Sequence, residues 1–355
     1  MGQYDVYGVG NALVDIEFEV DEAFFRDYRI KKGVMTLVDH EQQDHLLKIL
    51  SDTYGITKKS GGGSAGNTLY ALSHFGGRAC FTCKIANDQA GDFYLEQLGR
   101  DNIVTNVTSR EDGASGRCLV MISPDAERTM HTYLGVSEML SRKELDFQAA
   151  RQSKYIYLEG YLVTSPTAKS AITELKKFAK ENDVKTAMTF SDPAMLEYFR
   201  DDINDVLGSG VDLLFCNEQE LLLWAGTDSI EAGCSLMEDK ASQFVITRGA
   251  EGALLFDGED YISIKGHKVK AIDTNGAGDM FAGAFLYGVT FGDNTFVAVG
   301  AGGTVRTSSD NGSSWDNGTS GTTYYFNEVA YGDSTYIAVG QNGRIYTSSD
   351  NGTTW

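Results

Sequence analysis

The glycine-containing segment DTNGAGD, at positions 273–279, is the part of the sequence best suited to chemistry. Gly276, Ala277 and Gly278 have little or no side chain, so an anion can approach their backbone N–H groups closely. The apolar residues that follow predict a helix, which would place those groups at its positive end. Asp279 would stand beside the anion, where it could take a proton from an attacking hydroxyl group. The spacing alone equally allows Asp279 to be a plain helix cap.

Four further clusters have residue types that suit a phosphate or sugar site. Asn11 and Asp15 could hydrogen-bond vicinal hydroxyl groups. Asn217 and Glu220 lie three residues apart after an apolar strand and could hold Mg²⁺ through water. The small-residue candidates are Gly62, Gly63 and Asn67 in GGGSAGN, and Thr247, Gly249 and Gly252 in TRGAEG. Taken alone, each cluster is explained as well by glycine turns or helix caps.

The elements that would position these residues alternate between strand-like and helix-like segments from residue 1 to about 288. This alternation predicts an α/β fold with a mainly parallel sheet. Apolar residues recur on one stripe of residues 165–181, which predicts an amphipathic helix. Apolar strands at 184–190, 211–217 and 242–249 each end in a polar or glycine-containing turn. Because open α/β sheets bind ligands at the carboxyl ends of their strands, the candidate residues are expected to meet there.

Two excursions from this pattern alternate like hairpin strands and predict a small β lid, from about 12–40 and 108–135. In the first, residues 16–20 are expected to pair with residues 33–39. In the second, a hairpin is expected with its turn at Pro124 and Asp125. A β flap over a crevice at the strand ends could close on a substrate.

After about residue 288 the composition shifts to Gly, Ser, Thr, Asn and Tyr, and the sequence contains two copies of one repeat. Residues 291–315 align with residues 331–355, and alternating aromatic and β-branched residues make the repeat β. Each unit ends in S-x-D-x-G-x-x-W, which resembles the Asp-box of β-propeller blades. A structural turn is favoured over a sialidase-like surface, because no acid, base and nucleophile accompany the boxes. Two blades cannot close a ring, so the tail is expected to pair with copies of itself or to lie against the first domain.

The chain has 355 residues and a formal net charge of −20. A nucleic-acid surface needs clustered cations, so no nucleic-acid partner is expected. No apolar run reaches membrane-spanning length, so no membrane partner is expected either. Five cysteines do not suggest a disulfide framework in a chain of this size, which favours a reducing cytoplasm. The histidines share no ligand spacing and are not expected to bind a metal: His40, His45, His74, His131 and His267.

Together and in this order, the motifs resemble the PfkB family of carbohydrate and nucleoside kinases, within the ribokinase-like superfamily. DTNGAGD matches one hallmark motif of the family, and GGGSAGN matches the other more loosely. GNALVDI, at residues 10–16, looks closest to adenosine-kinase-like members, which implies a ribonucleoside or a related sugar as acceptor. The resemblance covers residues 1–288 and implies a ribokinase-like sheet flanked by helices with a small β lid.

The resemblance also implies a role for each candidate residue. Asp279 would be the catalytic base, and the amides of Gly276, Ala277 and Gly278 would hold the migrating phosphoryl group. Glu220 would be linked to Mg²⁺ through water. The implied nucleotide-side residues are Asn217, Glu220, Thr247, Gly249 and Gly252, and the implied substrate-side residues are Asn11, Asp15, Gly62, Gly63 and Asn67.

The expected function is ATP- and Mg²⁺-dependent phosphorylation of a hydroxymethyl group on a small sugar or nucleoside. In the family, further helices follow the glycine-rich helix, whereas here the two predicted propeller-blade repeats of residues 289–355 begin. The alternative is therefore a catalytically impaired, chimeric scaffold. Such a scaffold would assemble through its blade repeats. As a separate expectation, a homo-oligomer could form through the blade repeats or the lid.

Overall fold

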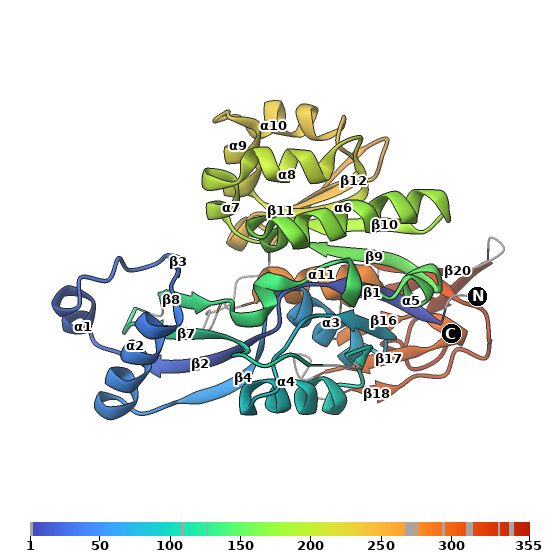
Figure 1. Cartoon of the computed structure of the whole chain (residues 1–355). Helices are drawn as coiled ribbons and strands as arrows, with labels where there is room; N and C mark the ends of the chain where they lie inside the picture. The colour runs from blue at the N-terminus through green and yellow to red at the C-terminus, as the bar shows by residue number, and fades with distance from the viewer. Residues whose placement is uncertain are drawn as a thin grey trace.

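A nine-stranded sheet runs through the centre of the computed structural model (Figure 1). The structure describes residues 3–107, 110–125, 127–266, 274, 276–292, 295–309, 315–332, 334–340 and 344–355. Neighbouring strands from β6 to β12 pair in parallel, and β13 and β14 add an antiparallel edge. In spatial order the strands are β14 (Tyr261–Ile264), β13 (Ala253–Phe256), β12 (Ala241–Thr247), β11 (Val211–Asn217), β10 (Lys185–Thr189), β9 (Ser153–Glu159), β1 (Tyr4–Val9), β5 (Ala79–Thr82) and β6 (Val104–Thr105). This sheet confirms the α/β fold expected from the alternating pattern.

Helices cover both faces of the sheet, because its strands are apolar on both sides. Along β9, Ile156 and Leu158 enter one hydrophobic core while Tyr157 enters the other. The helices of the first face are α5 (Phe147–Arg151), α6 (Pro166–Glu181), α7 (Pro193–Tyr198), α8 (Arg200–Leu207), α9 (Glu218–Ala225) and α10 (Ile230–Met237). Those of the second core are α1 (Glu22–Asp27), α2 (His40–Thr53), α3 (Ser64–His74), α4 (Gln89–Arg100) and α11 (Ala277–Tyr287).

Helix α6 illustrates how the sequence determines a local element. Ser165 caps its first turn by accepting a hydrogen bond from the Ala168 amide, and Pro166 occupies the first helical position. Ile172 and Leu175 of its apolar stripe are fully buried in the first core. The helix predicted at residues 165–181 is thus confirmed.

A separate five-stranded sheet forms the lid, in the order β3 (Met35–Leu37), β8 (Arg128–Tyr133), β7 (Gly116–Ile122), β2 (Leu13–Glu19) and β4 (Lys58–Gly62). The hairpin expected around Pro124 is present as β7 and β8. The pairing expected between residues 16–20 and 33–39 is wrong. Strand β2 pairs with β7 and β4, while β3 pairs with β8. The reason is that helix α1, capped by Asp21, leads the chain away from β2 and buries its own two phenylalanines.

The C-terminal repeats form two small antiparallel sheets, and no closed ring of blades is described. The first sheet is β15 (Val289–Gly292), β16 (Thr295–Val299), β17 (Val305–Ser308) and β18 (Asp316–Asn317). The second is β19 (Phe326–Gly332), β20 (Thr335–Gly340) and β21 (Arg344–Ser348). Of the first S-x-D-x-G-x-x-W motif, Asp310 and Gly312 lie outside the described residues. In the second, Asp350 accepts hydrogen bonds from Ser348 Oγ and the Thr354 amide, as in a structural turn.

The first β repeat lies against the helices of the second core, which was one of the two arrangements expected for the tail. The Trp315 ring packs edge-on against Phe75 at the end of α3, with centroids 5.2 Å apart. Arg306 donates a hydrogen bond to the His74 carbonyl at 3.2 Å. Ala298 is fully buried in the same core as Tyr287 of α11. The repeat therefore helps to hold α3 and α11 in place.

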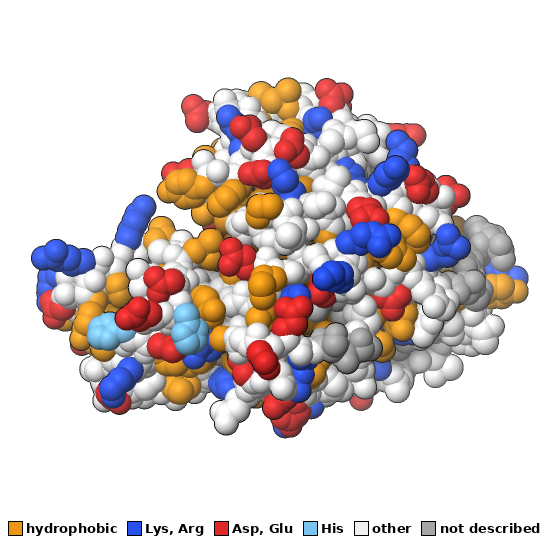
Figure 2. All heavy atoms as spheres, in the orientation of Figure 1, with side chains coloured by type: hydrophobic (Ala, Val, Ile, Leu, Met, Phe, Trp, Pro, Cys, Tyr) orange, Lys and Arg blue, Asp and Glu red, His pale blue; other side chains and the backbone are white. Residues whose placement is uncertain are grey.

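The surface carries mixed charges. On the face shown in Figure 2, Lys and Arg side chains are dispersed among Asp and Glu and form no large basic patch. Among the helices that the structure describes, none is both long enough and apolar enough to span a membrane.

Replacing Trp315 by Ala is expected to lower the free energy of unfolding by about 2–3 kcal/mol, since a partly exposed ring loses less than a core ring. The change should also speed hydrogen exchange in α3 and α11. The matched control is Trp355→Ala, which removes the same ring from the second repeat, where it packs against Phe326 and Tyr336 instead. Urea denaturation and peptide-resolved hydrogen exchange measure both effects. Equal exchange in α3 and α11 for the two variants would contradict this view of the interface.

Candidate active site

A cavity of about 280 Å³ lies where the carboxyl ends of the central strands face the lid. It brings together most of the residues singled out from the sequence, from the lid, α3, β11, β12 and α11. The predicted residues that line it are Asn11, Asp15, Gly63, Asn67, Asn217, Glu220, Thr247, Gly276, Ala277, Gly278 and Asp279. The predicted residues outside this lining are Gly62, Gly249 and Gly252.

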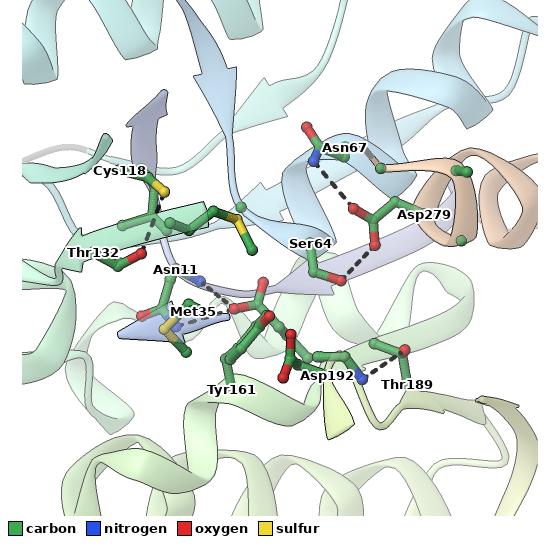
Figure 3. A pocket seen from close by; sticks show the side chains of 18 of the residues that line it. Asn11, Met35, Ser64, Asn67, Cys118, Thr132, Tyr161, Thr189, Asp192 and Asp279 are labelled. Atoms are coloured by element: carbon green, nitrogen blue, oxygen red, sulfur yellow. Dashed lines mark hydrogen bonds between the residues drawn. The ribbon is translucent and has the colours of Figure 1, made fainter. Parts of the chain in front are cut away.

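The Asp279 carboxylate is held from α3 by two hydrogen bonds. Ser64 Oγ donates to Oδ1 at 2.6 Å, and Asn67 Nδ2 donates to Oδ2 at 3.1 Å (Figure 3). Burial raises the pKa of Asp279 to about 6, while the two hydrogen bonds favour the ionised form and oppose this rise. Asp279 therefore changes charge close to neutral pH, as a general base requires, and it is not paired with a cation among the described residues.

Close packing of two helices brings Asp279 to α3. A Cβ atom on Gly283 of α11 would lie 2.4 Å from the Thr68 carbonyl oxygen and 2.6 Å from the Ala71 Cβ, so only glycine permits this approach. The glycine at this point of contact thus sets the distance between Asp279 and its two donors.

The N-terminus of α11 presents only part of the predicted set of amides. Gly276 is the N-cap, in the left-handed conformation with φ of 65°. The Ala277 amide already donates to the Thr274 carbonyl at 3.2 Å. No described acceptor takes the Gly278 amide, which is exposed on the cavity lining. Gly278 is therefore the amide of this turn best placed to meet an anion.

Asn11 is fixed by a buried carboxylate that the sequence analysis did not identify. Glu159, fully buried at the end of β9, accepts hydrogen bonds from the Asn11 amide and side chain at 3.3 and 3.0 Å. Its other oxygen accepts from the Ala65 amide in the first turn of α3 at 2.9 Å. Burial raises the pKa of Glu159 to about 7. One carboxyl group thus joins the start of the lid to the helix that holds Asp279.

Asp15 lies beside Asn11 with its carboxylate free for a ligand, since no described residue donates a hydrogen bond to it. Burial, with the nearby charge of Glu17, raises its pKa to about 7. Two glycines make room around this pair. A Cβ on Gly62 would lie 2.3 Å from the Asp15 carboxylate, and one on Gly63, whose φ is 93°, would lie 2.2 Å from the Asn11 carbonyl. Gly62 therefore acts on the cavity through Asp15.

Asn217 and Glu220 form a capping box at the start of α9. Asn217 Oδ1 accepts from the Glu220 amide at 2.8 Å, and Glu220 Oε2 accepts from the Asn217 amide at 2.9 Å. Both residues also line the cavity, and no described residue donates a hydrogen bond to the second carboxylate oxygen of Glu220. Burial raises the pKa of Glu220 to about 7, and the charges of Asp192 and Asp279 add to this rise.

The TRGAEG segment forms the turn from β12 to β13. Thr247, the last residue of β12, lines the cavity. Gly249 has a φ of 54° and open space around it. Gly252 has a φ of 98°, and a Cβ there would overlap the Ile264 carbonyl oxygen at 2.0 Å. Gly252 is thus explained by the packing of the turn.

The lid supplies an apolar wall opposite the polar residues. Met35 of β3, Cys118 of β7 and Met130 of β8 line the cavity together with Leu13 and Leu134. Thr132 Oγ1 donates a hydrogen bond to Cys118 Sγ at 3.3 Å (Figure 3). These apolar residues lie in segments predicted as lid, but their direction could not be derived without the strand register.

The cavity is strongly acidic. Five carboxyl groups line it, from Asp15, Glu159, Asp192, Glu220 and Asp279, whereas its described lining contains no Lys, Arg or His. None of the four described histidines lines it, and His267 lies outside the described residues. Within the described ranges, no cluster of three His, Cys, Asp or Glu residues is arranged to hold a metal by itself. An anionic ligand would therefore need a cation to enter with it.

Comparison with known proteins gives a consistent result. The family model described as pfkB family carbohydrate kinase matches residues 39–302. The adenosine kinase of Saccharomyces cerevisiae is 25% identical over 314 residues, which cover 83% of this chain and 91% of the yeast protein. The structure of adenosine kinase from Sinorhizobium meliloti is 32% identical with a TM-score of 0.75, covering 80% of this chain and 86% of that one. A probable sugar kinase from Rhizobium etli is 31% identical with a TM-score of 0.76, covering 81% and 87%.

The family match spans well over half of the chain, and the relatives just described cover four fifths of it. The chain therefore belongs to the pfkB family of carbohydrate kinases, as a sugar or nucleoside kinase.

Proposed function

We propose that this protein transfers the γ-phosphoryl group of ATP to a hydroxymethyl group of a ribonucleoside or a closely related sugar, with Asp279 as the base. The observation that supports this most strongly is the position of Asp279. Its carboxylate faces the cavity, is held by Ser64 and Asn67, and lies one residue from the exposed Gly278 amide. A proton acceptor and an N–H group that can donate a hydrogen bond to an anion are thus adjacent at the start of one helix.

In the proposed reaction the acceptor oxygen forms a bond to the γ-phosphorus as the bond to the ADP oxygen breaks. Asp279 takes the proton of the attacking hydroxyl group, so that no free alkoxide has to form. The amides of Gly276 and Gly278 and the positive end of α11 stabilise the charge on the migrating phosphoryl group. Ala277 contributes to this turn through its shape, because its amide is already engaged.

The donor set fits Mg²⁺, which prefers oxygen ligands and keeps several waters. Glu220 has an unengaged carboxylate oxygen on the cavity, and the buried carboxyl groups around it need a positive charge to become ionised together. We assign Glu220, acting through water, and its partner Asn217 to this ion. When bound, Mg²⁺ would neutralise phosphate charge. Thr247 and the turn at Gly249 and Gly252 would lie on the nucleotide side.

On the acceptor side, Asn11 and Asp15 suit the two vicinal hydroxyl groups of a ribose. The apolar lid wall around Met35 and Met130 suits a flat nucleobase better than a second polar sugar. The adenosine kinases among the relatives favour the same choice. Adenosine is therefore the first acceptor to test.

The competing hypothesis is an impaired, chimeric scaffold that assembles through its β repeats or lid, because the repeats stand where helices follow in the family. It predicts that neither nucleotide binding nor turnover is measurable. Titration of the full chain with ATP and Mg²⁺ by calorimetry separates the two hypotheses. Saturable binding supports the kinase, and its absence, together with stable oligomers in sedimentation, supports the scaffold.

Replacing Asp279 by Asn is expected to lower kcat by about a hundred- to ten-thousand-fold, the usual contribution of a general base. ATP binding should be as tight or tighter, since a negative charge leaves the cavity. ADP release with adenosine and ATP calorimetry measure the two effects. The control is Asp239→Asn, at the opposite end of the strands, which should leave both unchanged. Turnover by Asp279→Asn at the rate of the unmodified chain would refute its role as base.

The rate should rise with pH as Asp279 loses its proton, because only the ionised carboxylate can accept another. Ser64→Ala removes a hydrogen bond that favours the ionised form, so the pKa of Asp279 rises and the acidic limb of kcat/KM moves to higher pH. The profile should be measured from about pH 5 to about pH 9. Ser73→Ala, a change in the same helix where Ser73 bonds the Asp101 carbonyl, should leave the limb in place. A limb that moves to lower pH in Ser64→Ala would contradict the assignment.

Asp15→Asn keeps the shape of the side chain but removes its charge. If Asp15 accepts hydrogen bonds from ribose hydroxyls, kcat/KM for adenosine should fall about ten- to a hundredfold, the worth of a charged hydrogen bond. The loss should be much smaller for 2′,3′-dideoxyadenosine, which lacks both hydroxyls. Steady-state kinetics with both acceptors gives the ratio. An equal loss for the two would show that Asp15 does not contact those hydroxyls.

A further inference from the structure

The first β repeat packs against the kinase body, by which we mean residues 1–288, and the second β repeat packs against the first. Equivalent residues of the two repeats therefore have equivalent surroundings. Positions 40 residues apart in the sequence correspond, so Ala298 corresponds to Ala338 and Val297 to Ile337. Ala298 faces the body, where it packs in the core of α3 and α11. Its counterpart Ala338 faces the first repeat and is fully buried there.

The contact between the repeats shows what the outer face of a repeat accepts. Val297, Val299 and Val305 form the outer face of the first repeat and are at most 2% exposed. They are covered by the inner face of the second repeat, which presents Phe326, Val329, Tyr336 and Ala338, with Trp355 beside them. Tyr336 Oη also donates to the Thr295 carbonyl at 3.0 Å, and Thr319 bridges to Thr354. An aliphatic outer face thus receives an aromatic inner face.

The second repeat has a corresponding outer face, but no described residue covers it. Its three residues, Ile337, Val339 and Ile345, correspond to the three buried valines of the first repeat. They are 41%, 38% and 68% exposed. Val339 and Ile345 are cross-strand partners on β20 and β21, so the three side chains form one continuous aliphatic patch. We call this patch the outer face.

We propose that the outer face is a docking surface for a further β repeat of the same sequence type, one that presents an aromatic inner face. The support is continuity with an interface already present in the molecule. The first repeat shows the same aliphatic face in its covered state, and the chain itself shows the kind of surface that covers it. Single exposed apolar residues need no such explanation, but a patch whose internal duplicate is fully buried does.

A second copy of this chain is a poorer occupant. Its first inner face is covered by α3 and α11, and its second by the first repeat, as shown by the burial of Ala298 and Ala338. Two copies could therefore meet only through two aliphatic outer faces, without the aromatic partner seen inside the chain. The proposed partner must bring a free inner face.

The test extends the full chain at Trp355 with a second copy of residues 316–355. Trp315 is followed by this same segment, so the extension repeats the native junction. Cysteine at position 345 (Ile345→Cys) reports exposure through its rate of reaction with a maleimide. The five native cysteines are all buried and free, so they give little background. Ile345→Cys should react rapidly in the chain of native length and about tenfold more slowly in the extended chain.

The matched label is Ile264→Cys, on the edge strand β14 of the nine-stranded sheet, where the native side chain is 57% exposed. Its rate should be the same in both chains. An extension whose counterparts of Phe326, Tyr336 and Trp355 are replaced by Ser should give no protection at position 345. As a second arm, the 316–355 polypeptide added to the chain of native length should slow the Ile345→Cys reaction saturably.

Two outcomes would overturn the proposal. Unchanged labelling of Ile345→Cys in both the extended chain and the mixture would show that the outer face does not accept a repeat. Protection in the native-length chain alone, rising with protein concentration and lost with Val339→Lys, would show that a second copy covers the face instead.

Discussion

The close approach of α3 and α11 is the constraint on which the active site depends. Gly283 permits it, and through it Ser64 and Asn67 reach the Asp279 carboxylate. Glu159 extends the same arrangement to the lid, since it bonds Asn11 with one oxygen and the first turn of α3 with the other. Asp279, its two hydrogen-bond donors and the start of the lid are therefore positioned as a unit. A shift of α3 would move all of them, which is why the packing of Trp315 on Phe75 matters to a site far from it in the sequence.

The second property of the site is its charge. Five carboxyl groups face one cavity whose described lining lacks a cation, and burial raises the pKa of four of them to about 6 or 7. Such a cavity is expected to lose protons when a positive ion enters, because the positive charge favours ionised carboxylates. A polyphosphate could not enter it alone, because like charges repel strongly at low dielectric. In the proposed reaction, the same acidity would couple the binding of nucleotide and metal, and the amides of α11 would serve as uncharged hydrogen-bond donors to the phosphate.

Much of the fold could be predicted because it is encoded locally. The apolar strands that end in polar turns, the stripe of α6 and the glycine-rich start of α11 each specify their own element. Asp279, Asn11, Asp15, Asn67 and Thr247 were identified because small or polar residues follow strands or open helices at these points. The lid pairing was wrong because strand partners depend on long-range register, which α1 redirects.

Three features of the site could not be derived from the sequence. Glu159 gives no motif, since it is the last residue of an apolar strand and its role depends on Asn11 and Ala65, 148 and 94 residues away. Ser64 lay inside a motif that was identified, but its bond to Asp279 depends on the packing of two helices. The engagement of the Ala277 amide by Thr274 depends on the detailed shape of the turn. Asn217 and Glu220 also show that a helix cap can lie on the cavity, since they form the capping box of α9 and line the cavity together.

The most direct test of the central claim is a crystal structure of the full chain with adenosine, Mg²⁺ and a non-hydrolysable ATP analogue. The account predicts the 5′-oxygen of adenosine within about 3 Å of an Asp279 carboxylate oxygen, and the γ-phosphoryl group at the exposed amide of Gly278. A nucleoside bound with its hydroxymethyl group directed away from Asp279, or a triphosphate placed elsewhere than the start of α11, would contradict it.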